Sequence, residues 1–286
     1  MTDTLHALNR KRYLRWILIQ IGKVAIILFV LAYLFPIIWM ILSSFKIQSD
    51  AYAMPPKWVF KPTLMNYREI LLNRGLIKFL GNSLLIVSLS CVATLFIGTM
   101  AAFALGRFRF KGNRDIAFYI MSTRMAPPVM VIIPIFIMYR YALNLYNSYA
   151  GMVLVYTAMN LPLAVWLLRG FFLEIPHELD EAAEIDGCSK WTAFWKVIFP
   201  LSGPGLAATG ILSFIFAWNE FFFALILTAK KTRTLPVTVT SFVSGMGIEW
   251  GELNAAGTII MIPLLIFAFF MQKHLLRGLT LGAVKG

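Results

Sequence analysis

Acidic side chains gather in one polar segment of an otherwise apolar chain. Six of the thirteen Asp and Glu residues fall within thirteen positions, and they are Glu174, Glu178, Asp180, Glu181, Glu184 and Asp186. No HExxH or GxSxG motif and no paired-carboxylate site of a soluble domain accompanies them. The small Ala182 and Ala183 among them would let another protein approach closely. On spacing alone, the pattern fits either a docking surface or a solvated acidic loop with an interfacial helix.

Local signals predict two short helices in this segment. Pro176 suits a helix start, the acidic residues after it complement the positive end of the helix dipole, and Gly187 is placed for a left-handed closing residue. A helix is therefore expected over about 176–186. Ser189 is a good N-cap for a second helix along the membrane interface. Its apolar positions repeat at helical spacing before Pro200, and they are Trp191, Phe194, Trp195 and Ile198.

A second group of chemically capable residues lies inside apolar blocks, where polar groups are costly and mark candidate sites. Arg124 and Glu220 are opposite charges that could pair, either in a solute pathway or for structure alone. Trp218 lies on an aromatic stripe that could contact a carbohydrate or simply pack. Lys23, near the end of its block, is expected to extend its charge to the interface. The candidate pathway residues are Arg124, Asn160, Trp218, Asn219 and Glu220.

The elements that must position these residues are transmembrane helices. The chain has 286 residues, of which 59% are hydrophobic and 14% charged, and its mean hydropathy is +0.76. Soluble domains carry about 25% charged residues, so an ordinary soluble enzyme is excluded. Six apolar blocks are long enough to cross a bilayer of about 30 Å as α-helices. They are Trp16–Leu42, Leu80–Leu105, Ile116–Met138, Tyr149–Phe171, Pro204–Leu227 and Ala255–Leu275.

Two of these blocks contain helix breakers. Prolines remove backbone donors, so Pro127, Pro128 and Pro134 predict a broken third span, near a gated pathway or as a packing kink. Asn160 and Pro162 predict a similar irregularity in the fourth span. The second span instead carries a ridge of small residues for close helix packing. That ridge consists of Thr94, Gly98, Ala102 and Gly106.

The distribution of basic residues orients the bundle. The net charge of +13 comes from residues spread between apolar blocks, without the interleaved aromatics of a nucleic-acid groove, so no nucleic-acid partner is expected. An even number of spans puts both termini on one side. With the termini inside, the inner segments hold 14 basic residues and the outer segments hold 10. The positive-inside rule therefore predicts cytoplasmic termini, including residues 1–15 and 276–286.

The chain lacks the parts needed to hydrolyse ATP or to do redox chemistry. Gly22-Lys23 is followed by Val24, so no GxxxxGK[ST] phosphate loop is present. Cys91 and Cys188 form no metal motif or disulfide framework, and no metal or cofactor is expected on this chain. Energy for active transport would have to enter from another subunit, through the acidic segment.

The acidic segment also matches a known pattern. Glu181-Ala-Ala is followed by three residues, Gly187, nine residues and then Val197-Ile-Phe-Pro200. This resembles the EAA loop of ABC importer permeases, with Val197 and Phe199 as conservative departures from its I-x-L-P ending and Cys188 where alanine is usual. The resemblance covers nearly the whole chain and is greatest to maltose-type sugar permeases. Supporting stretches begin at Thr123 (TRMAPPV), Trp218 (WNEFFFAL) and Arg277 (RGLTLGAVKG).

The resemblance implies the fold and the partners. It implies an all-α, six-helix bundle of the type I ABC importer kind in a bacterial or archaeal cytoplasmic membrane, with the first helix at 16–42 and a five-helix core at 80–275. It implies a second permease, two cytoplasmic ATPase subunits that carry ATP and Mg, and an extracytoplasmic sugar-binding protein. The EAA loop, within 174–203, would contact the ATPase through Glu181, Ala182, Ala183, Asp186 and Gly187. The chain end at Gly282–Gly286 would reach toward the ATPase pair.

The solute is expected to be an oligosaccharide or glycoside. Three alternatives stay open: import of another small solute such as a polyol or glycerol phosphate, a self-contained secondary transporter or channel, and a membrane-embedded enzyme or assembly factor. No inverted repeat is visible to favour a secondary transporter. Co-purification with a protein that contains a phosphate-loop ATPase motif would distinguish these classes.

Overall fold

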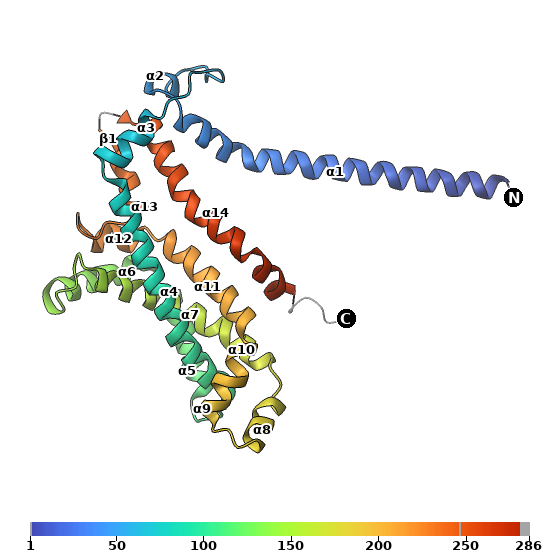
Figure 1. The fold of residues 1–286 in the computed structure, drawn as a ribbon, viewed down its shortest axis with the longest axis vertical. Helices are drawn as coiled ribbons and strands as arrows, with labels where there is room; N and C mark the ends of the chain where they lie inside the picture. Colours follow the sequence, from blue (N-terminus) through green and yellow to red (C-terminus); the bar gives the residue numbers. More distant parts are fainter. Residues whose placement is uncertain (1, 246, 281–286) are drawn as a thin grey trace. The chain divides into compact units, whose positions relative to one another are not determined.

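The computed structural model describes residues 2–245 and 247–280, in which helices predominate (Figure 1). Two compact units share the chain. The first holds residues 1–70 and 248–258, and the second holds residues 71–247 and 259–286. The start of the last helix thus falls in the first unit, whereas the sequence assigned all of that helix to a core at 80–275. That domain layout stays a prediction.

The first unit is dominated by α1 (Thr2–Ser44), a single helix of 43 residues. The predicted span at 16–42 lies inside it, and Pro36 does not interrupt it. Apolar side chains along this span are largely exposed, Phe29 and Tyr33 among them. A helix that buries so little within its own chain needs lipid or another subunit around it.

Polar and aromatic contacts fix the segment that follows α1 in the first unit. The side-chain amide of Asn66 donates to the carbonyl oxygens of Ser44 and Lys46, each at 2.8 Å. The ammonium of Lys46 lies 4.1 Å from the centre of the Trp39 ring. Burial lowers the pKa of Lys46, against the opposing effect of Asp50. The other elements here are α2 (Gln48–Ala51), α3 (Met65–Arg68) and the start of α14 (Trp250–Thr280).

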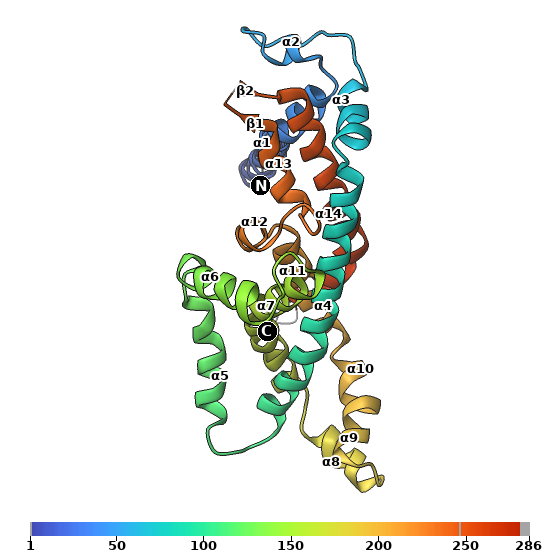
Figure 2. The same ribbon diagram turned by 90° about the vertical axis from the view of Figure 1, so that its left-hand side faces the viewer.

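The second unit is built on the long helices α4 (Leu76–Arg107) and α7 (Tyr149–Glu174), which contain the predicted second and fourth spans (Figure 2). The small-residue ridge of α4 lies against α7. A Cβ atom added at Gly98 would lie 3.2 Å from the Cβ of Ala164, and one at Gly106 would lie 3.3 Å from the Cβ of Phe172. The packing role predicted for the ridge is confirmed.

Shorter elements complete the chain, and three of them, η1, η3 and η4, are π-helical. In chain order the elements are η1 (Glu69–Asn73), α5 (Asn113–Ser122), η2 (Thr123–Met125), α6 (Pro128–Ile137), η3 (Met138–Ala142), α8 (Glu178–Ile185), α9 (Lys190–Ala193), η4 (Phe194–Ile198), α10 (Phe199–Leu201), α11 (Gly203–Trp218), α12 (Phe222–Leu227), α13 (Leu235–Val239), η5 (Thr240–Phe242), β1 (Val243–Ser244) and β2 (Gly247–Ile248).

The third span is not one straight helix. The helical segments Asn113–Met125 and Pro128–Ala142 meet at 92°, directly before Pro128. Pro127 adopts an extended backbone there, which ends the first segment, and Pro128 starts the next. The expected span at 116–138 is thus a bent pair of helices, and the predicted break is confirmed.

The fourth span departs from prediction in the opposite sense. α7 continues through Pro162 to Glu174 as one helix of 26 residues, so the predicted irregularity near Asn160 is wrong. Pro162 is buried inside the helix, and the side-chain amide of Asn160 donates to the carbonyl of Tyr156 at 3.0 Å. Proline is tolerated in such a helix where neighbouring protein groups surround it.

The predicted fifth span at 204–227 is interrupted after Trp218. The amide of Asn219 donates back to the carbonyl of Ile215 at 2.8 Å, at the end of α11. The carboxylate of Glu220 accepts the backbone N–H groups of Phe223 and Ala224, at 3.0 and 3.2 Å, at the start of α12. These two polar residues satisfy the helix ends, which explains a break that hydropathy could not predict.

Four helices are individually long and apolar enough to cross a membrane, and six spans result if each of two bent helix pairs counts as one. Two apolar clusters hold the second unit together. The first surrounds Tyr156 and Trp218, and the second surrounds Phe103, Phe172 and Phe194. The architecture is an all-α, polytopic bundle, as predicted.

Candidate functional site: the loop helices and a cavity in the bundle

The acidic segment folds as the two short helices that the sequence predicts. α8 covers 178–185, slightly less than the expected 176–186. Gly187 has a φ of +84° and its N–H donates to the carbonyl of Glu184, while the N–H of Cys188 donates to the carbonyl of Ala183. This left-handed closure is confirmed, and it favours glycine because a Cβ atom is strained at such a φ.

The second loop helix begins as predicted. The hydroxyl of Ser189 accepts the N–H of Thr192 at 3.2 Å, so Ser189 is the N-cap of α9. The helix continues through η4 and α10, with Phe194 and Ile198 buried. It then meets α11 at 71°. In Figure 2 both loop helices lie where α4 ends.

α8 presents two different faces. Glu181, Ala182, Asp186 and Gly187 are exposed, as the predicted ATPase contact requires. Ala183 is buried on the side where α8 packs on α9 and η4, so it is the one member of the predicted set that lies away from the exposed surface. The exposed face also carries Ile185, whose side chain is 86% exposed. Sequence reasoning missed Ile185, because spacing does not tell which side of a short helix faces outward.

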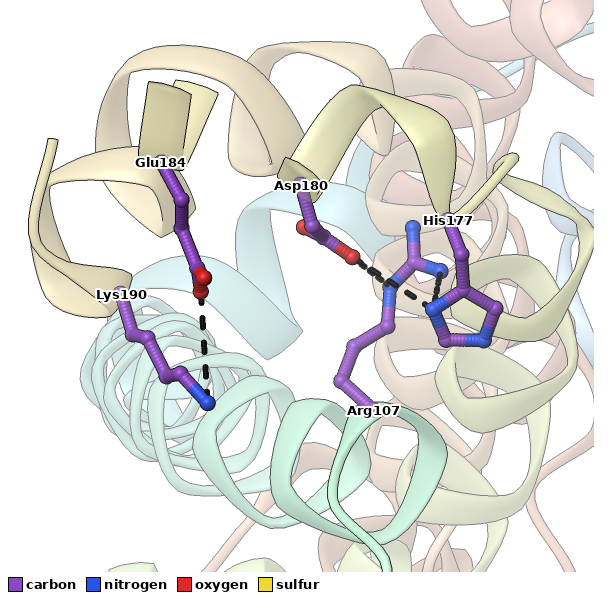
Figure 3. A network of polar contacts seen from close by, with 5 residues as sticks. All are labelled: Arg107, His177, Asp180, Glu184 and Lys190. Carbon is purple, nitrogen blue, oxygen red and sulfur yellow. Dashed lines mark hydrogen bonds and ion pairs between the residues drawn. The ribbon is translucent and has the colours of Figure 1, made fainter. Parts of the chain in front are cut away.

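The inner face of α8 contacts a buried cation at the end of α4. The Nε atom of Arg107 lies 3.4 Å from Oδ2 of Asp180, and its Nη1 lies 3.3 Å from Nδ1 of His177 (Figure 3). The Arg107 side chain is only 3% exposed. Farther along, Nζ of Lys190 lies 4.0 Å from Oε1 of Glu184. The sequence marked Arg107 only as part of a basic loop.

A partly open cavity of about 500 Å³ lies among the helices of the second unit. It is lined by residues of the bent third span, of α7 and of α11, together with Phe223. Three of the five predicted pathway residues line it, namely Arg124, Asn160 and Glu220. The cavity therefore brings together polar residues that are 96 positions apart in the sequence.

The expected ion pair between Arg124 and Glu220 is not formed in the described structure. The Arg124 guanidinium lies 5.0 Å from the centre of the Phe216 ring. The Glu220 carboxylate instead caps α12, and the Tyr156 hydroxyl donates to the Glu220 backbone carbonyl at 3.3 Å. The break after α11 is the physical reason, because it turns the carboxylate toward backbone donors.

The other two predicted pathway residues do not line the cavity. Trp218 is buried, its indole N–H donates to the carbonyl of Ile260 at 3.2 Å, and its ring stacks on Phe214. Phe214 in turn stacks on Phe267 at 4.1 Å between centroids. Asn219 is exposed and bonds its own helix end. The aromatic stripe thus packs inside the protein, and the sequence could not have shown this because the partner rings come from α14.

Comparison with known proteins identifies the family. A family model described as "Binding-protein-dependent transport system inner membrane component" matches residues 94–281. The chain belongs to this family. As one of its members it is an ABC transporter permease, an inner-membrane component distinct from the ATPase.

Curated relatives cover almost the whole permease. The trehalose/maltose transport system permease protein MalG of Thermococcus litoralis is 39% identical over 281 residues, which are 97% of this chain and 99% of that protein. The diacetylchitobiose uptake system permease protein DasC of Streptomyces coelicolor is 37% identical and covers 92% of this chain and 95% of its own length.

The fold is shared with a solved transporter. A chain in the crystal structure of a bacterial ABC transporter involved in the import of the acidic polysaccharide alginate matches with a TM-score of 0.74 and 24% identity, covering 88% of this permease and 94% of that chain. The bundle is thus of the ABC importer permease type, as predicted. The predicted contact of the permease end at Gly282–Gly286 lies outside the described residues.

Proposed function

We propose that this permease forms half of the membrane pathway of an ATP-driven sugar importer. The movement of the ATPase subunits reaches the permease through α8. The exposed acidic face of α8 is the observation that carries this proposal. In this arrangement a second permease completes the pathway, two cytoplasmic ATPase subunits bind ATP and Mg, and an extracytoplasmic binding protein delivers the sugar. Both termini, residues 1–15 and 276–286, face the cytoplasm.

The chemistry of the α8 face defines what binds it. Ile185 is a large apolar side chain that is exposed to solvent. The nearby residues Glu178, Glu181 and Asp186 are exposed as well, and each carries a carboxylate. An apolar anchor with charged neighbours is the usual composition of a protein interface centre and rim. The matching surface is an apolar pocket with a basic edge on the ATPase.

Residues of the cavity support the pathway role. Arg124 and Asn160 offer donors and Glu220 offers a carbonyl and a carboxylate beside apolar walls. Sites for small polar solutes usually combine apolar walls with few polar groups. The sugar class rests on the relatives, whose names specify trehalose, maltose and diacetylchitobiose. Trp218 and Asn219 stay predicted pathway residues without support from the cavity.

The docking role is tested with Ile185→Glu in the complex expressed with its partner subunits. The substitution places a charge where an apolar pocket is expected, so the ATPase should no longer co-purify with the permease, and uptake of labelled trehalose, maltose and diacetylchitobiose should fall to background. Phe110→Glu is the control, because Phe110 is an exposed apolar residue on the neighbouring loop. Phe110→Glu should keep both properties.

Two results would contradict the proposal. If no protein with a phosphate-loop ATPase motif co-purifies with the unaltered permease, the permease does not work by ATP coupling. If Ile185→Glu retains the ATPase and normal uptake, the exposed face of α8 is not the docking surface. Transport of none of the three sugars by an otherwise ATPase-bound complex would remove the sugar assignment alone.

A further inference from the structure

Arg107 is a nearly buried cation between the bundle and α8. Its Nε and Nη1 atoms face Asp180 and His177 of the loop, and Nδ1 of His177 lies 3.7 Å from Oδ2 of Asp180 (Figure 3). A guanidinium stays charged at any physiological pH, so it has to be balanced by a nearby carboxylate when buried. Arg107 therefore holds α8 from the bundle side.

The bundle end of this contact is itself fixed. Nε of Arg169, on α7, donates to the carbonyl of Leu105 at 3.2 Å. The amide of Asn113 donates to the carbonyls of Leu105 and Phe108 at 3.1 and 2.8 Å. A Cβ atom added at Gly106 would lie only 3.3 Å from the Cβ of Phe172 of α7, so the two helices approach closely here. Arg107, which contacts α8, thus lies where hydrogen bonds and close packing join α4, α7 and the loop that follows α4.

The second ion pair lies within the loop, although Nζ of its Lys190 also lies 5.7 Å from the centre of the Phe108 ring. Lys190 and Glu184 both belong to the loop, their side chains are 68% and 48% exposed, and 4.0 Å separates the charged atoms. Exposed pairs of this kind contribute little to stability. Among the described residues, Arg107 supplies the charged contact from the bundle to α8.

The contact has room to rearrange. Nε and Nη2 of Arg107 are buried and make no hydrogen bond in this arrangement. A hollow of about 410 Å³ lies next to Arg107, and Asp180 and Glu184, one helical turn apart on α8, both line it. A shift of α8 can therefore bring either carboxylate to unused donors of the same guanidinium.

We propose that Arg107 is a positioning residue that passes the movement of α8 to the pathway. The route runs from α8 through Arg107 to the α4 and α7 pair, and α7 carries Tyr156, Met159 and Asn160 into the 500 Å³ cavity. The chain between α7 and α8 connects them covalently, and its Ile175 packs on the apolar cluster around Phe103. The ion pair through Arg107 adds a contact from α4 to α8, so a displacement of α8 also displaces the bundle. This inference rests on the proposed docking of the ATPase to α8.

The test follows one cavity residue in the intact transporter and needs no knowledge of the sugar. Ala158 of α7 is exposed in the cavity, so Ala158→Cys is introduced with Cys91→Ser and Cys188→Ser, and its labelling by a charged methanethiosulfonate is timed in nanodiscs with and without ATP and vanadate. Allosteric coupling typically changes an equilibrium by roughly 5- to 150-fold. We expect a change of about this size in the labelling rate when Arg107 is present.

Arg107→Gln should abolish this response while the ATPase stays bound and still traps nucleotide. Arg107→Lys, which keeps the charge opposite Asp180, should restore part of it, as should Arg107→Asp combined with Asp180→Arg. Arg114→Gln is the control, because Arg114 is an exposed cation at the start of α5 that is not among the residues lining this hollow, and it should behave like the unaltered chain.

The outcomes are distinguishable. A normal response in Arg107→Gln overturns the positioning role. Loss of the ATPase or of nucleotide trapping in both Arg107→Gln and Arg107→Lys also overturns it, because Arg107 would then serve docking or folding. If the chain with Arg107 intact binds no ATPase or shows no response, the proposed function fails instead.

Discussion

Asn147 shows how one side chain can fix a whole loop. Its Oδ1 accepts the N–H of Ala229 at 2.9 Å and both the N–H and the hydroxyl of Thr232, at 3.2 and 3.0 Å. Its own backbone has a φ of +54°. Asparagine tolerates this left-handed conformation better than most residues do. Asn147 therefore satisfies three donors from a position that few other side chains could occupy.

Asn147→Ala should destabilise the second unit by about 2–4 kcal/mol, because buried donors lose their acceptor and alanine is strained at positive φ. Asn147→Gly should cost about 1 kcal/mol less, since only the strain is relieved. Asn147→Asp, which keeps the acceptor, should change stability least. Thermal unfolding of the detergent-solubilised complex measures the order, and equal midpoints for the three variants would contradict this role.

At the residue scale, the helix caps could be predicted from the sequence, but which side chains of α8 are exposed could not. Gly187 and Ser189 were predicted correctly because a closing glycine and an N-cap depend on a few neighbouring residues. The outward position of Ile185 and the inward position of Ala183 depend on how α8 packs on α9 and η4. The absent Arg124–Glu220 pair depends on the break after α11, which hydropathy does not encode.

At the scale of the elements, the close packing of α4 on α7 depends on glycines, which have no side chain, at Gly98 and Gly106. Gly98→Leu should destabilise the permease by about 1–3 kcal/mol, because its side chain would collide with Ala164 where a Cβ atom alone comes within 3.2 Å. Gly81→Leu is the control on the same helix, since no atom lies within 4 Å of a Cβ added there. Unfolding midpoints and the yield of folded protein measure both.

If Gly81→Leu and Gly98→Leu lowered the unfolding midpoint equally, the close contact at Gly98 would contribute nothing special to stability.

The existence of the long helices α4 and α7 was predictable from apolar runs alone, and their ends were correct to within four residues. Prolines were less informative. Pro127 and Pro128 mark a real bend, whereas Pro162 is accommodated within α7, and only the surrounding packing separates the two cases.

For the whole molecule, the orientation of the bundle is still a prediction from basic residues. Lys111 and Lys230 are exposed in the second unit, and the predicted third, fourth and fifth spans separate them. With Cys91→Ser and Cys188→Ser as background, Lys230→Cys should react with an impermeant maleimide on intact cells. Lys111→Cys should react only after the cells are permeabilised, because its loop is predicted to be cytoplasmic.

The opposite labelling pattern would place the termini outside. Equal labelling of both positions on intact cells would mean that an even number of crossings separates them.

The overall class of the molecule was predictable, because the length of the apolar runs and the spacing of the EAA motif can be read directly from the sequence. The cavity was not, because its walls come from segments that only the folded chain brings together.

The right-angled bend of the third span has a consequence for the surrounding lipid. The segment Pro128–Ala142 contains the ten residues of α6 and the five of η3, so it rises roughly 22 Å, less than the roughly 30 Å of hydrocarbon in a typical bilayer. Because the preceding segment runs at 92° to it, the two cannot both stand along the membrane normal. Hydrophobic mismatch follows wherever this region meets lipid, so the free energy of placing it in a bilayer depends on the acyl-chain length of the lipids.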